Sequence, residues 1–349
     1  MTSHHLIPRK KTYLTILVLA LAISRVCPSA AAEGDDKPAA DGPWISSVAW
    51  LDDGHLVGTR SQGLLLRPAQ AVKIAVDQVG TDAEPEILGE AETSLWCVQP
   101  IADGKVIAGD YKGKLSIYGG GEPRGLDFET RWIRAMAAAP DGQMLAGTED
   151  GKLVTFSPAD GKETKRVEAG TAAIFDIAFS PAGDRVAVGC GDGTIRLLSW
   201  PALEAQSTMS RRNDAVWSLV FSNDGKHLVS GGADRRLQLW NVAEARSIAS
   251  IAKTPDWVTS LVALPDSNLV VAGCMNGAIV VADYETQRPV KVDAQLESGI
   301  WSIALSPNHQ QLAAGTRKHG FAVLEVADWI SAGQAAADEA HKIQPPKPE

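Results

Sequence analysis

An all-β fold made of seven repeated antiparallel sheets is the class that this 349-residue sequence predicts, on three observations. First, four glycines are spaced 42 residues apart: Gly189, Gly231, Gly273 and Gly315. Second, the text around them is nearly the same, as in V-W-S-L-V-F-S-N-D-G-K-H-L-V-S-G-G and I-W-S-I-A-L-S-P-N-H-Q-Q-L-A-A-G-T. Third, earlier glycines extend the series to seven copies: Gly58, Gly109 and Gly147. A period near 42 is typical of a four-stranded unit that buries its apolar faces only against its neighbours. Because ring closure protects sheet edges, the sequence predicts a seven-bladed β-propeller of four-stranded antiparallel blades.

The fifth copy shows how one repeat becomes a blade. Alternating apolar residues predict strands that are separated by Asp-Gly or Asn-Gly turns, which tolerate the positive φ of tight hairpins. The predicted strands are Ala215–Ser222, His227–Gly232, Leu237–Trp240 and a more polar outer strand at Ser247–Ala252.

These same stretches resemble the WD-repeat family. The matching text is F-S-N-D-G at Phe221–Gly225, G-D-G-T-I-R-L-L at Gly191–Leu198 and L-Q-L-W-N at Leu237–Asn241. The resemblance extends from Trp44 to about Val326 and implies a seven-bladed propeller that serves mainly as a platform for protein partners. Two features depart from the family pattern. The Gly-His dipeptide is missing, and only Trp240-Asn241 approaches the Trp-Asp ending, so the family's buried hydrogen-bond network cannot form in full.

The two chain ends lie outside the repeats. A basic segment, an eleven-residue apolar run and Ala30-Ala31-Ala32 predict a secretory signal peptide at 1–32; an uncleaved membrane anchor is the alternative. Residues 33–43 are a polar linker or a strand that closes the ring, and Trp329-Ile330 is the other candidate for that strand. The propeller is expected at 44–331, followed at 332–349 by a tail with an Ala-rich helix from Gln334 and a Pro-Lys end.

Charge and cysteine content narrow the partners. Without 1–32 the chain has 29 basic and 42 acidic side chains, a balance that repels nucleic acid and anionic lipid. We expect no nucleic-acid partner and no membrane span after cleavage. Three cysteines remain, an odd number that predicts buried free thiols: Cys97, Cys190 and Cys274.

Large aromatic residues recur at the start of the innermost strand of every copy. They are Trp44, Trp96, Trp132, Phe175, Trp217, Trp257 and Trp301. In a ring of seven blades these side chains form a circle at one end of the central channel. Such a circle is a candidate partner-binding surface, because aromatic residues dominate interface energetics. The alternative is that they wedge between neighbouring blades as packing residues.

Two irregularities break the symmetry of the repeats. The spacing between the first two copies grows by nine residues across Arg67–Thr93, an acidic segment that is either solvated or in contact with a partner. Arg60 and Arg317 follow the repeat glycine in the first and last copies, which become neighbours when the ring closes. They are a second candidate partner-binding site, for an acidic group.

No catalytic or metal-ligating constellation is evident in the sequence, and no cofactor is expected. The sequence therefore favours a non-catalytic, monomeric interaction platform, exported to the periplasm, cell envelope or extracellular space of a bacterium. A propeller hydrolase or lyase with its site in the channel is the alternative, since residues from different blades can converge there. A purely structural envelope component is a third possibility.

Overall fold

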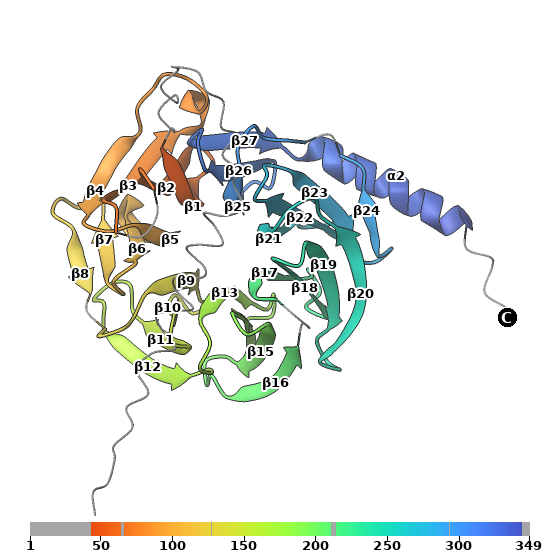
Figure 1. Cartoon of the computed structure of the whole chain (residues 1–349), viewed down its shortest axis with the longest axis horizontal. Helices are drawn as coiled ribbons and strands as arrows, with labels where there is room; N and C mark the ends of the chain where they lie inside the picture. The colour runs from red at the N-terminus through yellow and green to blue at the C-terminus, as the bar shows by residue number, and fades with distance from the viewer. Residues whose placement is uncertain (1–42, 64–65, 127, 211–213, 293, 344–349) are drawn as a thin grey trace, which may run out of the picture. The chain divides into compact units, whose positions relative to one another are not determined.

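The computed structural model describes residues 43–343 except 64–65, 127, 211–213 and 293. In this part of the chain, seven antiparallel sheets form a ring (Figure 1). The predicted seven-bladed β-propeller is confirmed, and we number its blades 1 to 7 in chain order. The segment 1–32 and nearly all of 33–43 lie outside the described residues, as does the end of the predicted tail.

Six blades have four described strands and the seventh has three. Blades 1 to 3 consist of β1 (Trp44–Asp52), β2 (His55–Ser61), β3 (Ala69–Ala75) and β4 (Glu86–Ala91); β5 (Leu95–Pro100), β6 (Val106–Asp110), β7 (Leu115–Tyr118) and β8 (Arg124–Leu126); and β9 (Ile133–Ala138), β10 (Met144–Thr148), β11 (Lys152–Phe156) and β12 (Glu163–Glu168). Blades 4 and 5 consist of β13 (Ile174–Phe179), β14 (Arg185–Cys190), β15 (Thr194–Ser199) and β16 (Ala205–Ser210); and β17 (Val216–Phe221), β18 (His227–Gly232), β19 (Arg236–Asn241) and β20 (Arg246–Lys253). Blades 6 and 7 consist of β21 (Val258–Ala263), β22 (Leu269–Cys274), β23 (Ile279–Asp283) and β24 (Arg288–Val290); and β25 (Ile300–Leu305), β26 (Gln311–Thr316) and β27 (Phe321–Glu325). Two short 3-10 helices, η1 (Val76–Gln78) and η2 (Ala102–Gly104), lie in loops.

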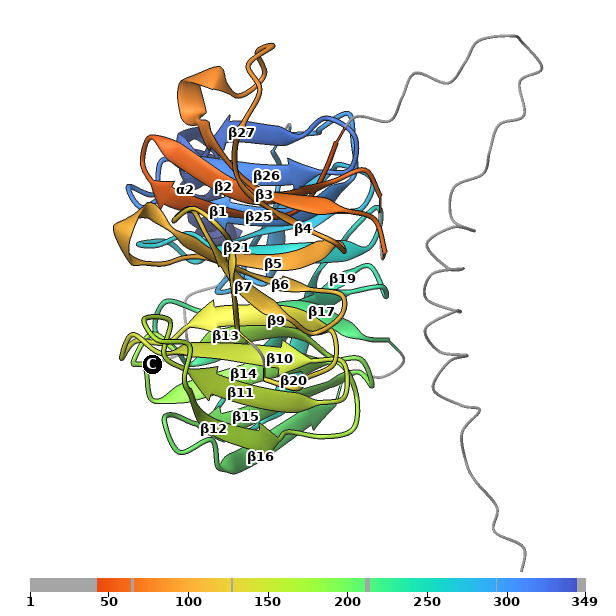
Figure 2. The ribbon, with the colours of Figure 1, turned by 90° about the vertical axis from the view of Figure 1, so that its left-hand side faces the viewer.

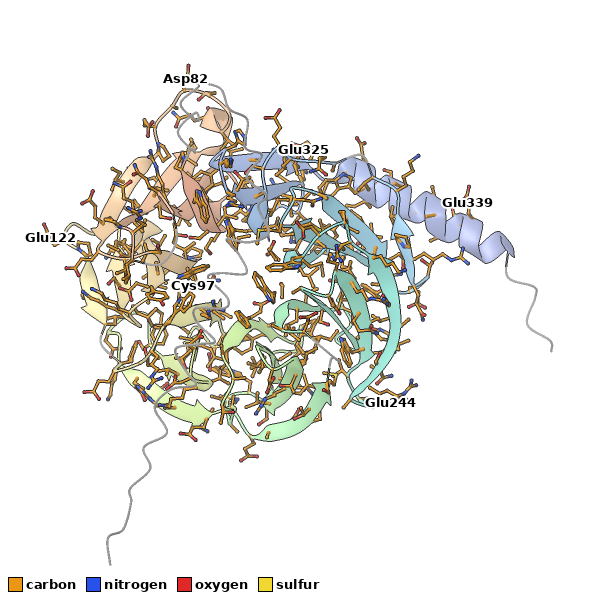
Figure 3. The ribbon with its side chains drawn as sticks, viewed as in Figure 1. Asp82, Cys97, Glu122, Glu244, Glu325 and Glu339 are labelled. Carbon is orange, nitrogen blue, oxygen red and sulfur yellow. The ribbon has the colours of Figure 1, made fainter. Side chains whose placement is uncertain are left out.

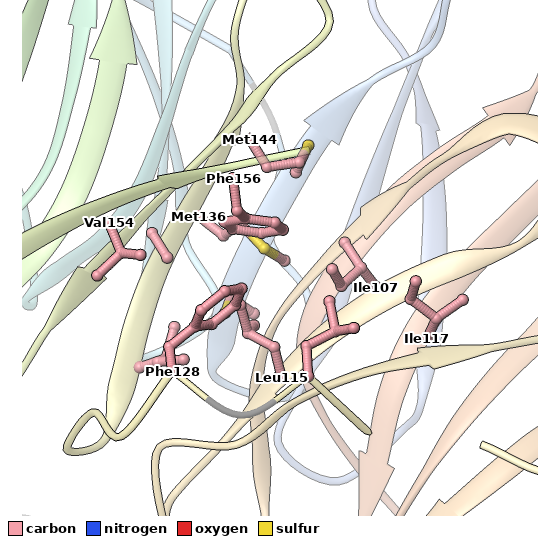
Figure 4. Close-up of a cluster of buried hydrophobic side chains, with 12 residues drawn as sticks. Ile107, Leu115, Ile117, Phe128, Met136, Met144, Val154 and Phe156 are labelled. Atoms are coloured by element: carbon pink, nitrogen blue, oxygen red, sulfur yellow. The ribbon is translucent and has the colours of Figure 1, made fainter. Parts of the chain in front are cut away.

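The core of the protein lies between the blades. Each of seven clusters of buried apolar side chains draws its residues from two neighbouring blades. Figure 4 shows the cluster between blades 2 and 3, where Ile107 and Leu115 meet Met136, Met144 and Phe156. In the side view of Figure 2 successive blades lie face against face around the ring. The copies therefore do pack on one another, as the repeat predicts.

The repeat glycine is required by this packing. A Cβ atom built on Gly231 would lie 2.3 Å from Val258 Cγ1, and one on Gly147 would lie 2.4 Å from Ile174 Cγ2. In both cases the obstacle is the first apolar residue of the next blade's inner strand. The 42-residue period thus marks the points where the second strand of one blade and the first strand of the next come closest.

The first and last blades close the ring through described strands. Val48 N donates a hydrogen bond to Ser302 Oγ at 3.3 Å, and the Trp50 indole donates to the Ala304 carbonyl at 2.9 Å. Ile45 packs against Gly315 across the same junction. Inner and second strands therefore join blade 7 to blade 1 directly.

The outer side of blades 6 and 7 carries a helix, α2 (Ala327–Ile343), which contacts β23 and β24 (Figure 1). The alternative that Trp329-Ile330 supplies the outer strand of blade 7 is wrong, because both residues lie in this helix. Trp329 is buried with Leu264 and Leu269 in the apolar cluster between blades 6 and 7. The helix also begins earlier than the predicted Gln334. Among the described residues, no helix is long and apolar enough to cross a membrane.

The three cysteines of the described residues, Cys97, Cys190 and Cys274, are buried and free, as predicted. Burial raises the pKa of the Cys97 and Cys274 thiols to about 12, so both remain protonated at neutral pH. Cys97 lies on the inner strand of blade 2, toward the centre of the ring (Figure 3).

A row of side chains on the inner strands of five blades links each of these blades to the next. We call it the inner-strand relay, because each member accepts a hydrogen bond from a backbone N–H of the following blade. Leu219 N donates to Asp176 Oδ2 at 2.8 Å, Leu261 N to Ser218 Oγ at 2.9 Å, Ile303 N to Ser260 Oγ at 3.1 Å, Val48 N to Ser302 Oγ at 3.3 Å and Val98 N to Ser47 Oγ at 3.2 Å. Blades 2 and 3 carry Cys97 and Ala135 at this position, a weak acceptor and a residue with no side-chain acceptor.

Asp176 is the one ionisable member of the relay, and we expect it to make stability depend on pH. Burial raises its pKa to about 6, although Leu219 N, Ser218 Oγ and its own following N–H all donate to the carboxylate. Folding therefore favours the protonated form. This contribution is complete below the unfolded pKa near 3.8 and is lost as the pH rises through 6.

Compared with Asp176→Ser, the native protein should therefore gain about 1 kcal/mol of unfolding free energy when the pH falls from about 7 to about 5. Urea denaturation of both proteins at each pH measures this difference. Ser260→Ala, which removes a neutral relay member, is the control and should shift stability equally at both pH values. Parallel pH profiles for native protein and Asp176→Ser would contradict the assignment.

Candidate partner-binding site

The start of each inner strand lies at one end of the ring. In the antiparallel register it pairs with the end of the second strand, as Leu95 does with Asp110 and Ile133 with Thr148. The loops between second and third strands therefore lie at this end too. Sequence reasoning placed seven aromatic side chains here, and the structure brings them into two groups.

The first group, the tryptophan cluster, belongs to blades 7, 1, 2 and 3 and consists of Trp301, Trp44, Trp96 and Trp132. Trp301 lies 5.9 Å from Trp44 and 6.2 Å from Trp96 between ring centroids, and Trp96 lies 5.0 Å from Trp132. Trp44, Trp132 and Trp301 are more than nine-tenths buried, whereas Trp96 is partly exposed. In this part of the circle the rings pack on one another, including Trp96 of blade 2 on Trp301 of blade 7.

The second group, the aromatic arc, belongs to blades 4, 5 and 6 and consists of Phe175, Trp217 and Trp257. Phe175 and Trp217 are stacked at 5.8 Å with nearly parallel rings, and Trp217 lies 5.4 Å from Trp257. All three side chains are only partly buried. The arc therefore offers aromatic surface to solvent across three neighbouring blades.

Arg134 joins the two groups, and sequence reasoning missed it. Its guanidinium lies 3.8 Å from the ring centroid of Trp132 and 4.2 Å from that of Phe175, so it is sandwiched between the cluster and the arc. The signal was present in the register, because Arg134 occupies in blade 3 the position that Trp96 and Phe175 occupy in blades 2 and 4. It was overlooked because only aromatic residues were compared.

The buried guanidinium is paired with Glu149, which follows β10. Arg134 Nε lies 3.0 Å from Glu149 Oε2. Burial lowers the pKa of Arg134 to about 10 and raises the pKa of Glu149, and each charge partly offsets the shift of the other. Tyr111, which follows β6, packs against Trp132, one of the two rings that enclose Arg134, at 4.5 Å between ring centroids. The junction of blades 2, 3 and 4 thus contains aromatic rings packed at tilted angles around one ion pair. Blades 2 and 3 are also those in which the relay position carries Cys97 and Ala135.

The two arginines predicted to share an acidic ligand have different partners. Arg317 lies over the Trp44 ring at 5.0 Å, at the edge of the tryptophan cluster. The Arg60 guanidinium forms an ion pair with Glu84 at 2.9 Å, so its partner is an acidic residue of the same chain.

The acidic segment Arg67–Thr93 is partly paired with its own blade and the next. Glu86 lies 2.7 Å from Lys73 and Glu92 lies 3.2 Å from Lys112. These pairs are exposed and contribute little stability. In the described chain, no group of three or more His, Cys, Asp or Glu side chains is arranged to hold a metal ion.

Comparison with known families identifies two repeats. The family model described as "WD domain, G-beta repeat" (WD40) matches residues 161–199 and 204–241. Each match covers the outer strand of one blade and the three inner strands of the next, blade 4 in the first match and blade 5 in the second. One hydrogen bond of a buried network is present in the second match, since the Trp240 indole donates to Ser230 Oγ at 2.9 Å. No curated protein matches the chain. The chain therefore contains WD40 repeats within a seven-bladed propeller, an architecture that commonly mediates protein interactions.

We expect Arg134→Met to destabilise the protein by about 3 kcal/mol, because it leaves Glu149 partly buried without its counter-ion. The double variant Arg134→Met, Glu149→Gln should recover most of that loss. Urea denaturation of the three proteins measures both effects. Arg185→Met is the control: its exposed pair with Asp184, at 3.6 Å, should be worth less than about 0.5 kcal/mol. Equal losses in the single and double variants would show that the ion pair is not what matters here.

Proposed function

We propose that this protein is a non-catalytic interaction platform that holds a protein partner at the aromatic end of its ring. The observation that carries the proposal is the aromatic arc, whose partly exposed rings run without interruption over blades 4, 5 and 6. Partly exposed Trp and Phe side chains supply large contact area at low entropic cost, which is why such residues dominate binding energies in interfaces.

The neighbouring tryptophan cluster supports the same assignment by its rigidity. Its four rings are packed on one another. Arg134 lies between Trp132 and Phe175 and so connects the cluster to the arc. A surface whose rings are already ordered loses little conformational freedom when a partner binds. The arc is therefore the part of this end that is both accessible and preorganised.

Capture of a partner tests the platform. The tagged mature chain is incubated with an extract of the cell envelope of its source, and proteins that co-purify are identified and their affinities measured. Trp217→Ala combined with Trp257→Ala should weaken capture at least about a hundredfold, as expected when two central aromatic contacts are removed. Trp301→Ala is unsuitable for this purpose, since Trp301 is buried in the cluster.

The matched control is Ile87→Ala, which removes an exposed apolar side chain from β4, on the outer strand of blade 1. It should leave capture unchanged. Circular dichroism confirms that each variant is folded. Undiminished capture by a folded Trp217, Trp257 double variant would exclude the arc as the binding surface.

We further propose that the protein is exported to the periplasm, the cell envelope or the extracellular space of a bacterium. The support comes from residues 1–32, where a basic segment precedes an apolar run and three alanines. The chain expressed in a bacterial host should be recovered outside the cytoplasm, and its N-terminal sequence should begin at Glu33. Recovery of an intact Met1 in the cytoplasmic fraction would reject export, whereas an intact Met1 in the membrane fraction would replace cleavage by a retained anchor.

A further inference from the structure

The outermost described strand of blade 7 has no described strand beside it. Blades 1 to 6 each have a fourth strand outside the third, whereas the sheet of blade 7 ends at β27 (Phe321–Glu325). The outward N–H and C=O groups of such an edge strand are a template for pairing with another chain. Natural proteins usually cover an edge of this kind, so the surroundings of β27 decide whether a further strand is accepted there.

The register shows which backbone groups of β27 face outward. Thr316 N donates to the Gly320 carbonyl at 2.9 Å, and Val326 N donates to the Gln310 carbonyl at 3.0 Å. In an antiparallel pair, bonded residues of this kind alternate with residues whose N–H and C=O groups point away from the neighbouring strand. The residues of β27 that point away from β26 are therefore Phe321, Val323 and Glu325. Within the described part of the chain, the backbone groups of these three residues make no hydrogen bond across the outer edge.

Apolar side chains lie on both sides of this edge. On the side of blade 1, Val76 and Val79, from η1 and the residue after it, pack against the same cluster as Val323. On the side of blade 6, Leu324 of β27 and Ile330 of α2 pack against the cluster between blades 6 and 7. All five side chains are only partly buried. Because side chains alternate between the two faces of a strand, apolar residues of an added strand would cover both sides.

The chain segments that flank the edge are acidic. Neither 74–85 nor 320–341 contains a Lys or Arg. Their exposed acidic residues include Asp77, Asp82, Glu325 and Asp328. Figure 3 shows two of them, Asp82 and Glu325, at the outer rim of the ring. An acidic surface attracts a basic partner and repels an acidic one.

We propose that the outer edge of β27 binds an extended, basic segment of a protein partner, which adds a fourth strand to blade 7. This site is separate from the aromatic arc, so the inference goes beyond the proposed function. Main-chain hydrogen bonds to Phe321, Val323 and Glu325 supply affinity, and apolar and basic side chains supply specificity. The segment 33–42, which the sequence leaves as a candidate closing strand, has four acidic residues and one lysine, so its charge opposes this acidic edge.

Amide hydrogen exchange of the full mature chain, followed by NMR, tests the edge directly. In the free protein, the amides of Phe321, Val323 and Glu325 should exchange faster than those of Ala322 and Leu324, which bond to β26. Addition of a blocked peptide of sequence K-V-T-V-T-V-K should slow exchange at the first three. Equal protection of all five amides in the free protein would show that the chain itself already pairs with this edge, and would overturn the proposal.

Two further peptides test the chemistry of the partner. The acidic peptide E-V-T-V-T-V-E should bind at least about tenfold more weakly than the lysine peptide, and added sodium chloride should reduce that difference. The lysine peptide with N-methyl groups on alternate residues lacks strand donors and should not bind. Equal affinities of the acidic and lysine peptides, or undiminished binding of the N-methylated peptide, would overturn a basic added strand.

Substitution of Val323 supplies a test in the protein. Val323→Pro removes an outward N–H group and leaves the N–H groups that bond to β26, so it should weaken binding of the lysine peptide at least about tenfold. The matched control, Val323→Thr, keeps the shape and the N–H group and should bind within about threefold of the native protein. Unchanged binding by a folded Val323→Pro variant would overturn the proposal, and the exchange data on the native protein decide the question if this variant fails to fold.

The outcome is separable from that of the aromatic arc. Binding of the lysine peptide should be unchanged in the variant that combines Trp217→Ala with Trp257→Ala, whether or not that variant captures a partner. Loss of peptide binding in this variant would place the peptide on the arc and overturn the site at β27.

Discussion

The rest of this structure depends on the fact that no blade can cover its own faces. A four-stranded sheet has two apolar sides, and here both are buried only by the blades on either side, through seven inter-blade clusters of side chains. The innermost strands must come closest, which is why a Cβ on Gly231 would meet Val258 of the next blade. The ring consequently has to close, and blade 7 meets blade 1 through hydrogen bonds of Val48 with Ser302 and of Trp50 with Ala304.

The inner-strand relay adds hydrogen bonds between neighbouring blades to this apolar packing. Its Ser and Asp acceptors satisfy backbone donors at five of the seven junctions, where unpaired N–H groups would otherwise lie in a poorly hydrated interior. Cys97 and Ala135 interrupt the series in blades 2 and 3. At the same blades, Arg134 and Glu149 form an ion pair beside the aromatic rings of Trp132 and Phe175. A buried ion pair is a costly substitute for neutral hydrogen bonds, because both charges lose hydration. This ion pair lies where the repeat pattern is interrupted. At this end of the ring the chain therefore has a feature that the packing of similar blades does not require.

The circle of aromatic residues shows that one repeated position can have two roles. In blades 7, 1, 2 and 3 the rings turn toward one another and are mostly buried, whereas in blades 4, 5 and 6 they keep exposed surface. Packing and recognition, which the sequence leaves as alternatives, are therefore divided between two halves of one circle. Fold alone does not establish function, and the case for a partner site rests on this asymmetry.

The sequence by itself determined the architecture, because the propeller's constraints are local and repeated. The spacing of Gly189 and Gly231, the alternating apolar strands and the Asp-Gly turns predict the strands of blade 5 to within one residue of those observed. Free, buried cysteines follow from their place in those strands. The tertiary structure alone decided which rings touch, that Trp329 lies in a helix instead of an outer strand, and that Glu84 forms an ion pair with Arg60. It also revealed Arg134, since a guanidinium between Trp132 and Phe175 is a contact between blades 3 and 4. The periodic pattern of the sequence predicts the features that every copy shares. The candidate site consists of residues that differ between copies, and these residues come into contact only in the folded ring.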